Sequence, residues 1–180
     1  MRIDANTSAI ELAALVSQTL EASGIKATLS GGGAVSTYTE NLYESEDLDF
    51  VTSERRETLS AALKPVGFTL SSDRRHFVHP DTTIILEFPA EPLQFGDRTV
   101  QHENIPRLET LWGPLRVTTP TLCVMDRLAA YWHWSDRQAW DQAVMVASRR
   151  DVDYEELVAF AIEEGAKPKE IEKLRKLAGR

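Results

Sequence analysis

The sequence predicts an α+β fold that ends in a helical region. Strand and helix patterns interleave over the first two thirds of the 180-residue chain, and helical patterns dominate from Thr119 and Pro120 onward. The sequence contains no internal repeat and no low-complexity linker. Interleaved strands and helices followed by helices alone favour an α+β class. We therefore expect one compact unit, with an α/β core at residues 1–118 and a helical region at residues 119–180 packed on it.

The first expected element is a helix from about Ser8 to Ser23. Ser8 and Glu11 have the spacing of a capping box, and Gly24 follows the last apolar position of the helical pattern. The elements expected next are a strand at 25–29, a turn at the glycines, a short helix at 34–40, a strand at 47–51 and a helix from 52 or 53 to 63.

The remaining strands are expected to be short, because the turn-rich segments SSDRR and HPDT separate them. Pro120 suits the first turn of a helix, and Gly165 suits a helix end. The elements expected here are strands at 68–70, 75–78 and 83–88, edge strands at 98–101 and 115–118, and helices that begin near 120, 135, 153 and 168.

Composition and charge narrow the classes of function. Hydrophobic residues at 42% and charged residues at 27% are ordinary for a soluble globular protein. The N-terminal segment lacks a secretory pattern, so we expect a cytoplasmic protein without a membrane partner. A net charge of −8 disfavours non-specific binding to DNA. Cys123 is the only cysteine, which excludes an internal disulfide, and the four histidines lack metal-ligand spacing, so zinc is not expected.

The run DLDFV places two carboxylates on one face of a predicted strand. Alternate side chains of a strand share a face, so Asp47 and Asp49 project together while Leu48 and Phe50 point into a core. Two neighbouring carboxylates repel each other unless a cation or a proton lies between them. Mg²⁺ is commonly held by a few carboxylates together with the phosphates of a substrate. The pair therefore predicts a magnesium site.

A third acid and a glycine turn extend this interpretation. Glu87 lies in the apolar run TTIILEF, where an ionised carboxylate is costly to bury without a partner. If its strand pairs beside residues 47–51, three acids could hold two metal ions. Gly31 and Gly32 would let backbone amides approach a phosphate at a helix start. The alternative is that these features are structural, because solvent-facing Asp-x-Asp pairs and glycine turns are common. Each feature alone is more often structural than catalytic.

The stretch LSGGGAV…YESEDLDFV resembles the nucleotidyltransferase superfamily, the fold shared by DNA polymerase β and the antibiotic-modifying nucleotidyltransferases. It is most similar to the AbiEii-type abortive-infection toxins, whose pattern is Gly-Gly-x-Ala followed by Arg-x-Ser-x-Asp-x-Asp. The matching positions are Gly31, Gly32 and Ala34, then Ser45, Asp47 and Asp49, with Tyr43 in place of the arginine. In the later segment TPTLCVMDRLAAYWHWSDRQAWDQA, Arg127 falls on a basic position and Gln138 replaces an aspartate. The structural alternative for Arg127 is a surface ion pair with Asp126 or Asp141.

The resemblance implies a small mixed β-sheet with helices packed on it. It also implies transfer of a nucleoside monophosphate from an NTP to an acceptor hydroxyl, with Mg²⁺ as cofactor. The acceptor would be a tRNA, a protein or a small molecule, and an antitoxin protein is a candidate partner. The implied site residues are Asp47, Asp49 and Glu87 as metal ligands and catalytic residues, Glu87 also as general base, and Gly31, Gly32, Ser45 and Arg127 as nucleotide contacts. The alternative is a non-catalytic member that binds a nucleotide or a partner, which Tyr43 and Gln138 favour.

Overall fold

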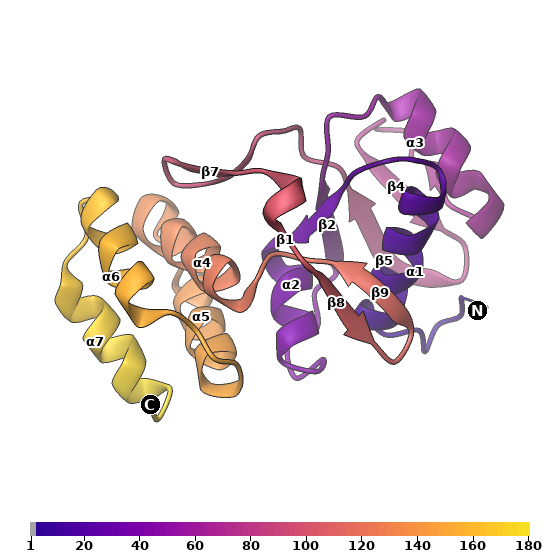
Figure 1. The fold of residues 1–180 in the computed structure, drawn as a ribbon. Helices are drawn as coiled ribbons and strands as arrows, with labels where there is room; N and C mark the ends of the chain where they lie inside the picture. The colour runs from indigo at the N-terminus through magenta and orange to yellow at the C-terminus, as the bar shows by residue number, and fades with distance from the viewer. Residues whose placement is uncertain (1–2) are drawn as a thin grey trace.

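The computed structural model describes residues 3–180 and confirms the α+β class (Figure 1). The elements up to residue 116 are α1 (Ala9–Ala22), β1 (Thr28–Ser30), α2 (Gly31–Tyr38), β2 (Asp47–Val51), α3 (Arg56–Leu63), a 3-10 turn (Lys64–Val66), β3 (Thr69–Leu70), β4 (His76–His79), β5 (Thr82–Glu87), β6 (Leu93–Phe95), β7 (Arg98–Val100), a 3-10 turn (His102–Asn104), β8 (Arg107–Thr110) and β9 (Gly113–Arg116). The helices that follow are α4 (Pro120–Trp134), α5 (Arg137–Arg149), α6 (Tyr154–Glu163) and α7 (Pro168–Leu177).

The central sheet is mixed and has the strand order β1-β2-β5-β4-β3. β2 and β5 run parallel, whereas the other neighbouring strands are antiparallel. The parallel register sets Asp49 beside Glu87 and Leu48 beside Leu86. The adjacency of these two strands, on which the three-acid prediction depends, is therefore present in the structure.

The core is built from the alternate positions of these strands. Leu48, Phe50 and Leu86 are fully buried, and Phe77 on β4 joins them. Burying side chains of this size contributes on the order of 2 kcal/mol each. Because neighbouring positions along a strand point to opposite faces, burial of Leu48 and Phe50 directs Asp49 to the other face of the sheet.

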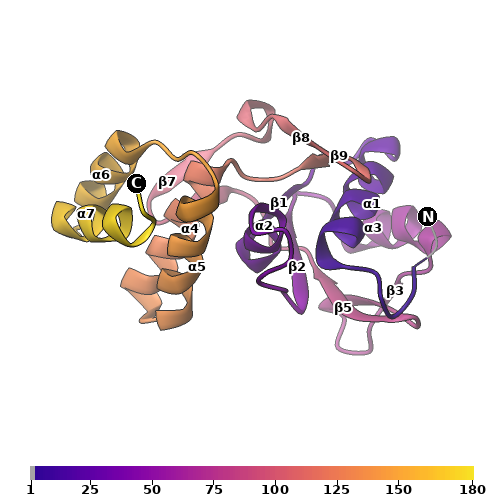
Figure 2. The same cartoon turned by 90° about the horizontal axis from the view of Figure 1, so that it is seen from below.

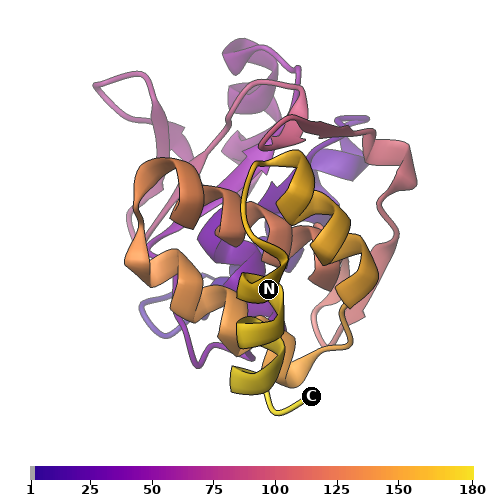
Figure 3. The ribbon, with the colours of Figure 1, turned by 90° about the vertical axis from the view of Figure 1, so that its left-hand side faces the viewer.

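The helices α4–α7 lie together at one end of the molecule, and α2 lies between them and the sheet (Figures 1, 2 and 3). Two contacts hold this arrangement around α2: Arg150 Nε donates to the carbonyl of Tyr38 at 3.0 Å, and the Tyr38 hydroxyl donates to the carbonyl of Thr118 at 2.6 Å. Arg98 at the start of β7 forms an ion pair with Glu163 of α6 at 2.8 Å. Within residues 3–180, none of the helices combines the length and the apolar character needed to cross a bilayer.

Several boundaries differ from the sequence expectations. The glycines were expected to form a turn, but Gly31–Gly33 form the first turn of α2, because the chain goes directly from β1 into the helix. The strand expected at 25–29 is β1 at Thr28–Ser30. β6 and β8 were not anticipated, since each pairs only with its neighbour in a two-stranded hairpin and lacks a strong apolar alternation. Cys123 is buried in α4.

Candidate functional site

Three of the predicted acids lie on neighbouring strands at one face of the sheet. Asp47 and Asp49 are alternate residues of β2, and Glu87 is the last residue of β5, in register with Asp49. All three are partly buried. The strand register alone brings the acids together, because residues that are paired in a sheet present their side chains to the same face.

Ser45 and the residues before it support the first acid. The Ser45 hydroxyl donates to Asp47 Oδ1 at 2.9 Å, and the Ser45 amide donates to the Ser36 hydroxyl at 2.9 Å. Ser45 itself is buried. The segment between α2 and β2 is thereby fixed to α2 at one point and to the acid pair at another. The structure thus places Ser45 against Asp47, where it orients that carboxylate.

The two glycines allow α2 to approach the acids closely. Gly31 has a φ of 61°, in the left-handed region that favours glycine, and a side chain at this position would overlap the Asp49 carboxylate. A side chain at Gly32 would overlap the Ser45 hydroxyl and would lie 3.5 Å from the Tyr43 hydroxyl. Tyr43 therefore lies beside the start of α2.

Asp49 has the most perturbed electrostatics of the site. Burial and the negative charges of three neighbouring acids together raise the pKa of its carboxyl from an ordinary 3.8 to about 7, against the opposing effect of Arg127; the acids are Asp47, Glu87 and Asp126. A carboxylate in such surroundings gains from a nearby cation or a proton. Strongly perturbed groups of this kind are concentrated at functional sites.

Asp126 is a fourth acid at the site, and the sequence analysis considered it only as a surface partner of Arg127. Asp126 Oδ2 accepts from the Gly31 amide at 3.2 Å and from Arg127 at 2.7 Å. The side chains of Asp126 and Arg127 are 21% and 16% exposed, so their ion pair is largely buried. Arg127 also donates to Gln142 at 3.3 Å. A carboxylate here occupies the helix N-terminus where an anion would bind.

His76 is a further residue that the sequence analysis did not assign to the site. Its Nε2 lies 2.8 Å from Glu87 Oε1 across the β4–β5 pairing, and its Nδ1 lies 2.7 Å from Asp73 Oδ2. A single histidine within a strand carries no local signal of this contact, since the pairing joins residues eleven positions apart (87 − 76).

The acids provide only some of the ligands that a divalent cation needs. Among residues 3–180, no three His, Cys, Asp or Glu side chains are arranged to hold a metal ion, and Glu87 Oε1 lies 2.8 Å from His76 Nε2. Asp47 and Asp49 nevertheless form a like-charged pair on one face, and Mg²⁺ is usually bound by one or two carboxylates plus phosphate oxygens. The donor set therefore fits an ion that a nucleotide brings with it. The ligand role of Glu87 stays a prediction.

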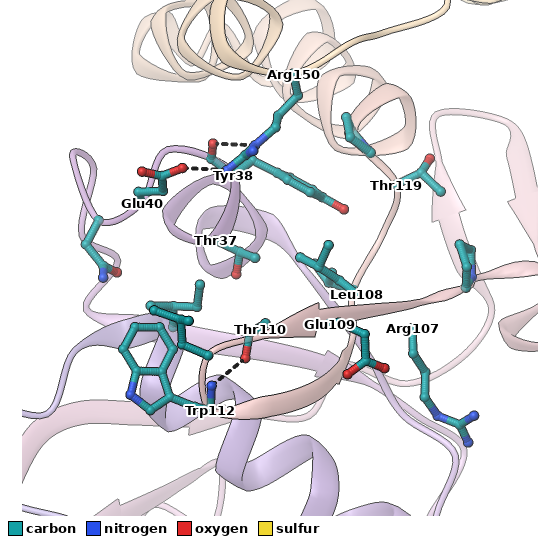
Figure 4. A pocket seen from close by; sticks show the side chains of 16 residues that line it. Thr37, Tyr38, Glu40, Arg107, Leu108, Glu109, Thr110, Trp112, Thr119 and Arg150 are labelled. Carbon is teal, nitrogen blue, oxygen red and sulfur yellow. Dashed lines mark hydrogen bonds and ion pairs between the residues drawn. The ribbon is translucent and has the colours of Figure 1, made fainter.

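A separate cavity of about 770 Å³ lies between the end of α2, the β8–β9 hairpin and the start of α4 (Figure 4). None of the predicted site residues is among the described residues that line it. Arg150 at its edge is already bonded to the Tyr38 carbonyl and to Glu40, as the dashed lines show, and Trp112 donates its amide to Thr110. The cavity is mainly apolar, whereas the perturbed carboxylate lies among the acids, which we therefore take as the candidate site.

The comparisons with known proteins support the fold. No family profile matches the chain, and no curated protein matches it in sequence. A nucleotidyltransferase-like antigenic protein from Paracoccidioides brasiliensis has a similar solved structure, with a TM-score of 0.56, 15% identity, and coverage of 79% of this chain and 75% of that one. The antibiotic-resistance factor ANT(2'')-Ia aligns at a TM-score of 0.49 and 14% identity, over 93% of this chain and 89% of that one. The fold is therefore nucleotidyltransferase-like.

Proposed function

We propose that this protein is a Mg²⁺-dependent nucleotidyltransferase that moves a nucleoside monophosphate from an NTP to an acceptor hydroxyl. The observation that supports the proposal most is the placement of Asp47 and Asp49 beside the glycine start of α2, with Glu87 in register opposite Asp49. A helix start whose backbone can approach a phosphate and a pair of carboxylates that can admit a cation are two features that phosphoryl transfer uses.

Each part of the site has a proposed task. Asp47, oriented by Ser45, and Asp49 bind the ion that accompanies the triphosphate. The bound Mg²⁺ would supply positive charge that offsets the charge developing on the phosphates. Gly31 and Gly32 let the backbone of the helix start lie close to the acids, where the triphosphate would bind. Arg127 would hold a phosphate oxygen once it exchanges Asp126 for the nucleotide.

In the proposed reaction, one bond forms and one bond breaks at the α-phosphorus of the NTP. The acceptor oxygen forms a bond to the α-phosphorus, the bond from that phosphorus to the bridging oxygen breaks, and pyrophosphate leaves. The proton of the acceptor hydroxyl passes to Glu87, the acid that is not committed to the Asp47 and Asp49 pair. The similarity of residues 31–49 to AbiEii-type toxins extends the proposal to a toxin-like, cytoplasmic enzyme with a tRNA, protein or small-molecule acceptor and an antitoxin partner.

A second candidate is a non-catalytic protein of the same fold that binds a nucleotide or a partner. Two observations favour it: the Gly31 amide and Arg127 are both bonded to Asp126, and Tyr43 replaces a cation beside the glycines. This candidate predicts Mg²⁺-dependent NTP binding without transfer to any acceptor.

The experiment that separates the two uses each α-labelled NTP with Mg²⁺ and a bacterial lysate divided into protein, tRNA and small-molecule fractions. The matched control is the Asp47→Ala/Asp49→Ala variant. Label that enters one fraction only with the intact acids supports the transferase and identifies the class of acceptor. NTP binding without label in any fraction supports the non-catalytic candidate, and the absence of both contradicts the two proposals together.

A further inference from the structure

His76 lies between two carboxylates at the edge of the acidic site. Its Nε2 contacts Glu87 Oε1 at 2.8 Å and its Nδ1 contacts Asp73 Oδ2 at 2.7 Å. The imidazole is 28% exposed and the Glu87 side chain 36% exposed, so both groups face the solvent side of the sheet, where Asp49 also lies. The result is a continuous chain of contacts from the β4 turn to the acid site.

The first member of the chain, Asp73, is hydrogen-bonded within its own turn. Asp73 accepts hydrogen bonds from the Ser71 hydroxyl and from the Arg75 amide, the latter at 2.8 Å, and these bonds hold the pKa of its carboxyl below the ordinary range. A carboxylate fixed by its own turn can set the orientation of an imidazole ring. Asp73 therefore fixes the direction in which His76 presents Nε2.

The last member of the chain is held at one oxygen only. His76 contacts Glu87 Oε1, and within residues 3–180 no hydrogen bond involves Oε2. Residues 76 and 87 are directly paired in the antiparallel register, which places the two side chains on the same face of the sheet. The charge of Glu87 still acts on Asp49, and no three-ligand arrangement occurs among the described residues.

The same kind of chain occurs at a second place in the fold and shows what distinguishes the first. His102 Nδ1 lies 2.6 Å from the Thr28 hydroxyl, and its Nε2 lies 2.8 Å from Glu91. Thr28 is wholly buried and His102 nearly so, which leaves no room for a substrate. His76 differs in two ways: its ring is 28% exposed against 8% for His102, and its carboxylate partner Glu87 is in register with Asp49.

We propose that His76, oriented by Asp73, is a positioning residue that directs Glu87 Oε2 to the acceptor hydroxyl and keeps Glu87 out of metal coordination. This inference rests on the proposed transferase function and deepens it. It divides the acids into a metal-binding pair, Asp47 and Asp49, and a separately held proton acceptor. The hydroxyl proton moves to Glu87 Oε2 as the oxygen–phosphorus bond forms, while Oε1 stays in contact with His76.

The test compares His76→Ala, His76→Gln, Asp73→Asn and Glu87→Gln with a control on the same strand, His79→Gln. We expect Glu87→Gln to lower kcat about 100-fold or more, the usual range for a lost proton acceptor. His76→Ala should lower kcat about tenfold with an unchanged KM for the NTP, and His76→Gln, which keeps an N–H donor, should recover most of the loss. Unchanged kcat in His76→Ala, or an equal loss in His79→Gln, would overturn the proposal.

Two further readouts need no turnover and separate this proposal from the proposed function. The affinity of Mg²⁺ with a non-hydrolysable NTP should be unchanged in Glu87→Gln and His76→Ala and should fall in Asp49→Asn. A fall in Glu87→Gln equal to that in Asp49→Asn would make Glu87 a metal ligand and refute the division of roles. In long-range ¹H–¹⁵N spectra, the chemical shifts of the His76 ring nitrogens should change in Asp73→Asn and in Glu87→Gln. Ring shifts that are unchanged in both variants would show that the chain of contacts is absent.

Discussion

The ionised Asp49 carboxylate should lower the free energy of unfolding above about pH 7. Its pKa is about 7 in the folded protein and an ordinary 3.8 in the unfolded chain, so folding favours the protonated form. The neutral carboxyl contributes stability that is fully present below the unfolded pKa and is lost as the pH rises through about 7. A difference of about 3 pKa units corresponds to about 4 kcal/mol. Because the group is only partly buried, we take about 2 kcal/mol as the expected effect.

The Asp49→Asn variant tests this reasoning, since asparagine keeps the shape and removes the charge. Urea unfolding with a chelator should show a variant more stable than the wild type by about 2 kcal/mol near pH 8, with the gain almost absent near pH 4. An exposed control, Glu172→Gln, should change stability by less than about 0.5 kcal/mol at either pH. An Asp49→Asn variant that is destabilised near pH 8, or equally affected at both pH values, would refute the reasoning.

Three further predictions concern the same site. Added Mg²⁺ at about 100 times its dissociation constant should stabilise the wild type against urea by about 2.7 kcal/mol and should leave Asp47→Asn/Asp49→Asn unchanged; equal stabilisation of both proteins would place the ion elsewhere. Gly32→Ala should lose about 1 to 3 kcal/mol of stability, because the added methyl overlaps Ser45, and calorimetry should show weaker NTP binding. Arg127→Ala should lose about 3 kcal/mol in thermal unfolding, because it leaves a largely buried carboxylate unpaired, and a loss below about 0.5 kcal/mol would contradict the buried ion pair.

The sequence was most informative where chemistry and local pattern coincide. The alternation in DLDFV predicted both the buried positions of Leu48 and Phe50 and the shared face of Asp47 and Asp49. The α+β class and the mixed sheet are confirmed as well. The division at residues 118 and 119, the Mg²⁺ and NTP, and the roles of the site residues stay predictions.

The parts of the site that the sequence did not predict depend on contacts between distant segments. Asp126 reaches Gly31 across 95 residues, and no local pattern distinguishes it from an acid on the surface of a helix. His76 meets Glu87 only because a hairpin aligns them. β6 and β8 are short and pair only within hairpins, so their apolar alternation is too brief to stand out.

The bond between Asp126 and the Gly31 amide also bears on the order in which the protein becomes competent during synthesis. The glycine start of α2 and the three acids leave the ribosome well before α4, and domains fold as their segments emerge. Until α4 docks, the amide at the helix start has no carboxylate partner and Arg127 is missing. A nascent chain therefore carries only part of the candidate site, which is completed when α4 folds against the start of α2.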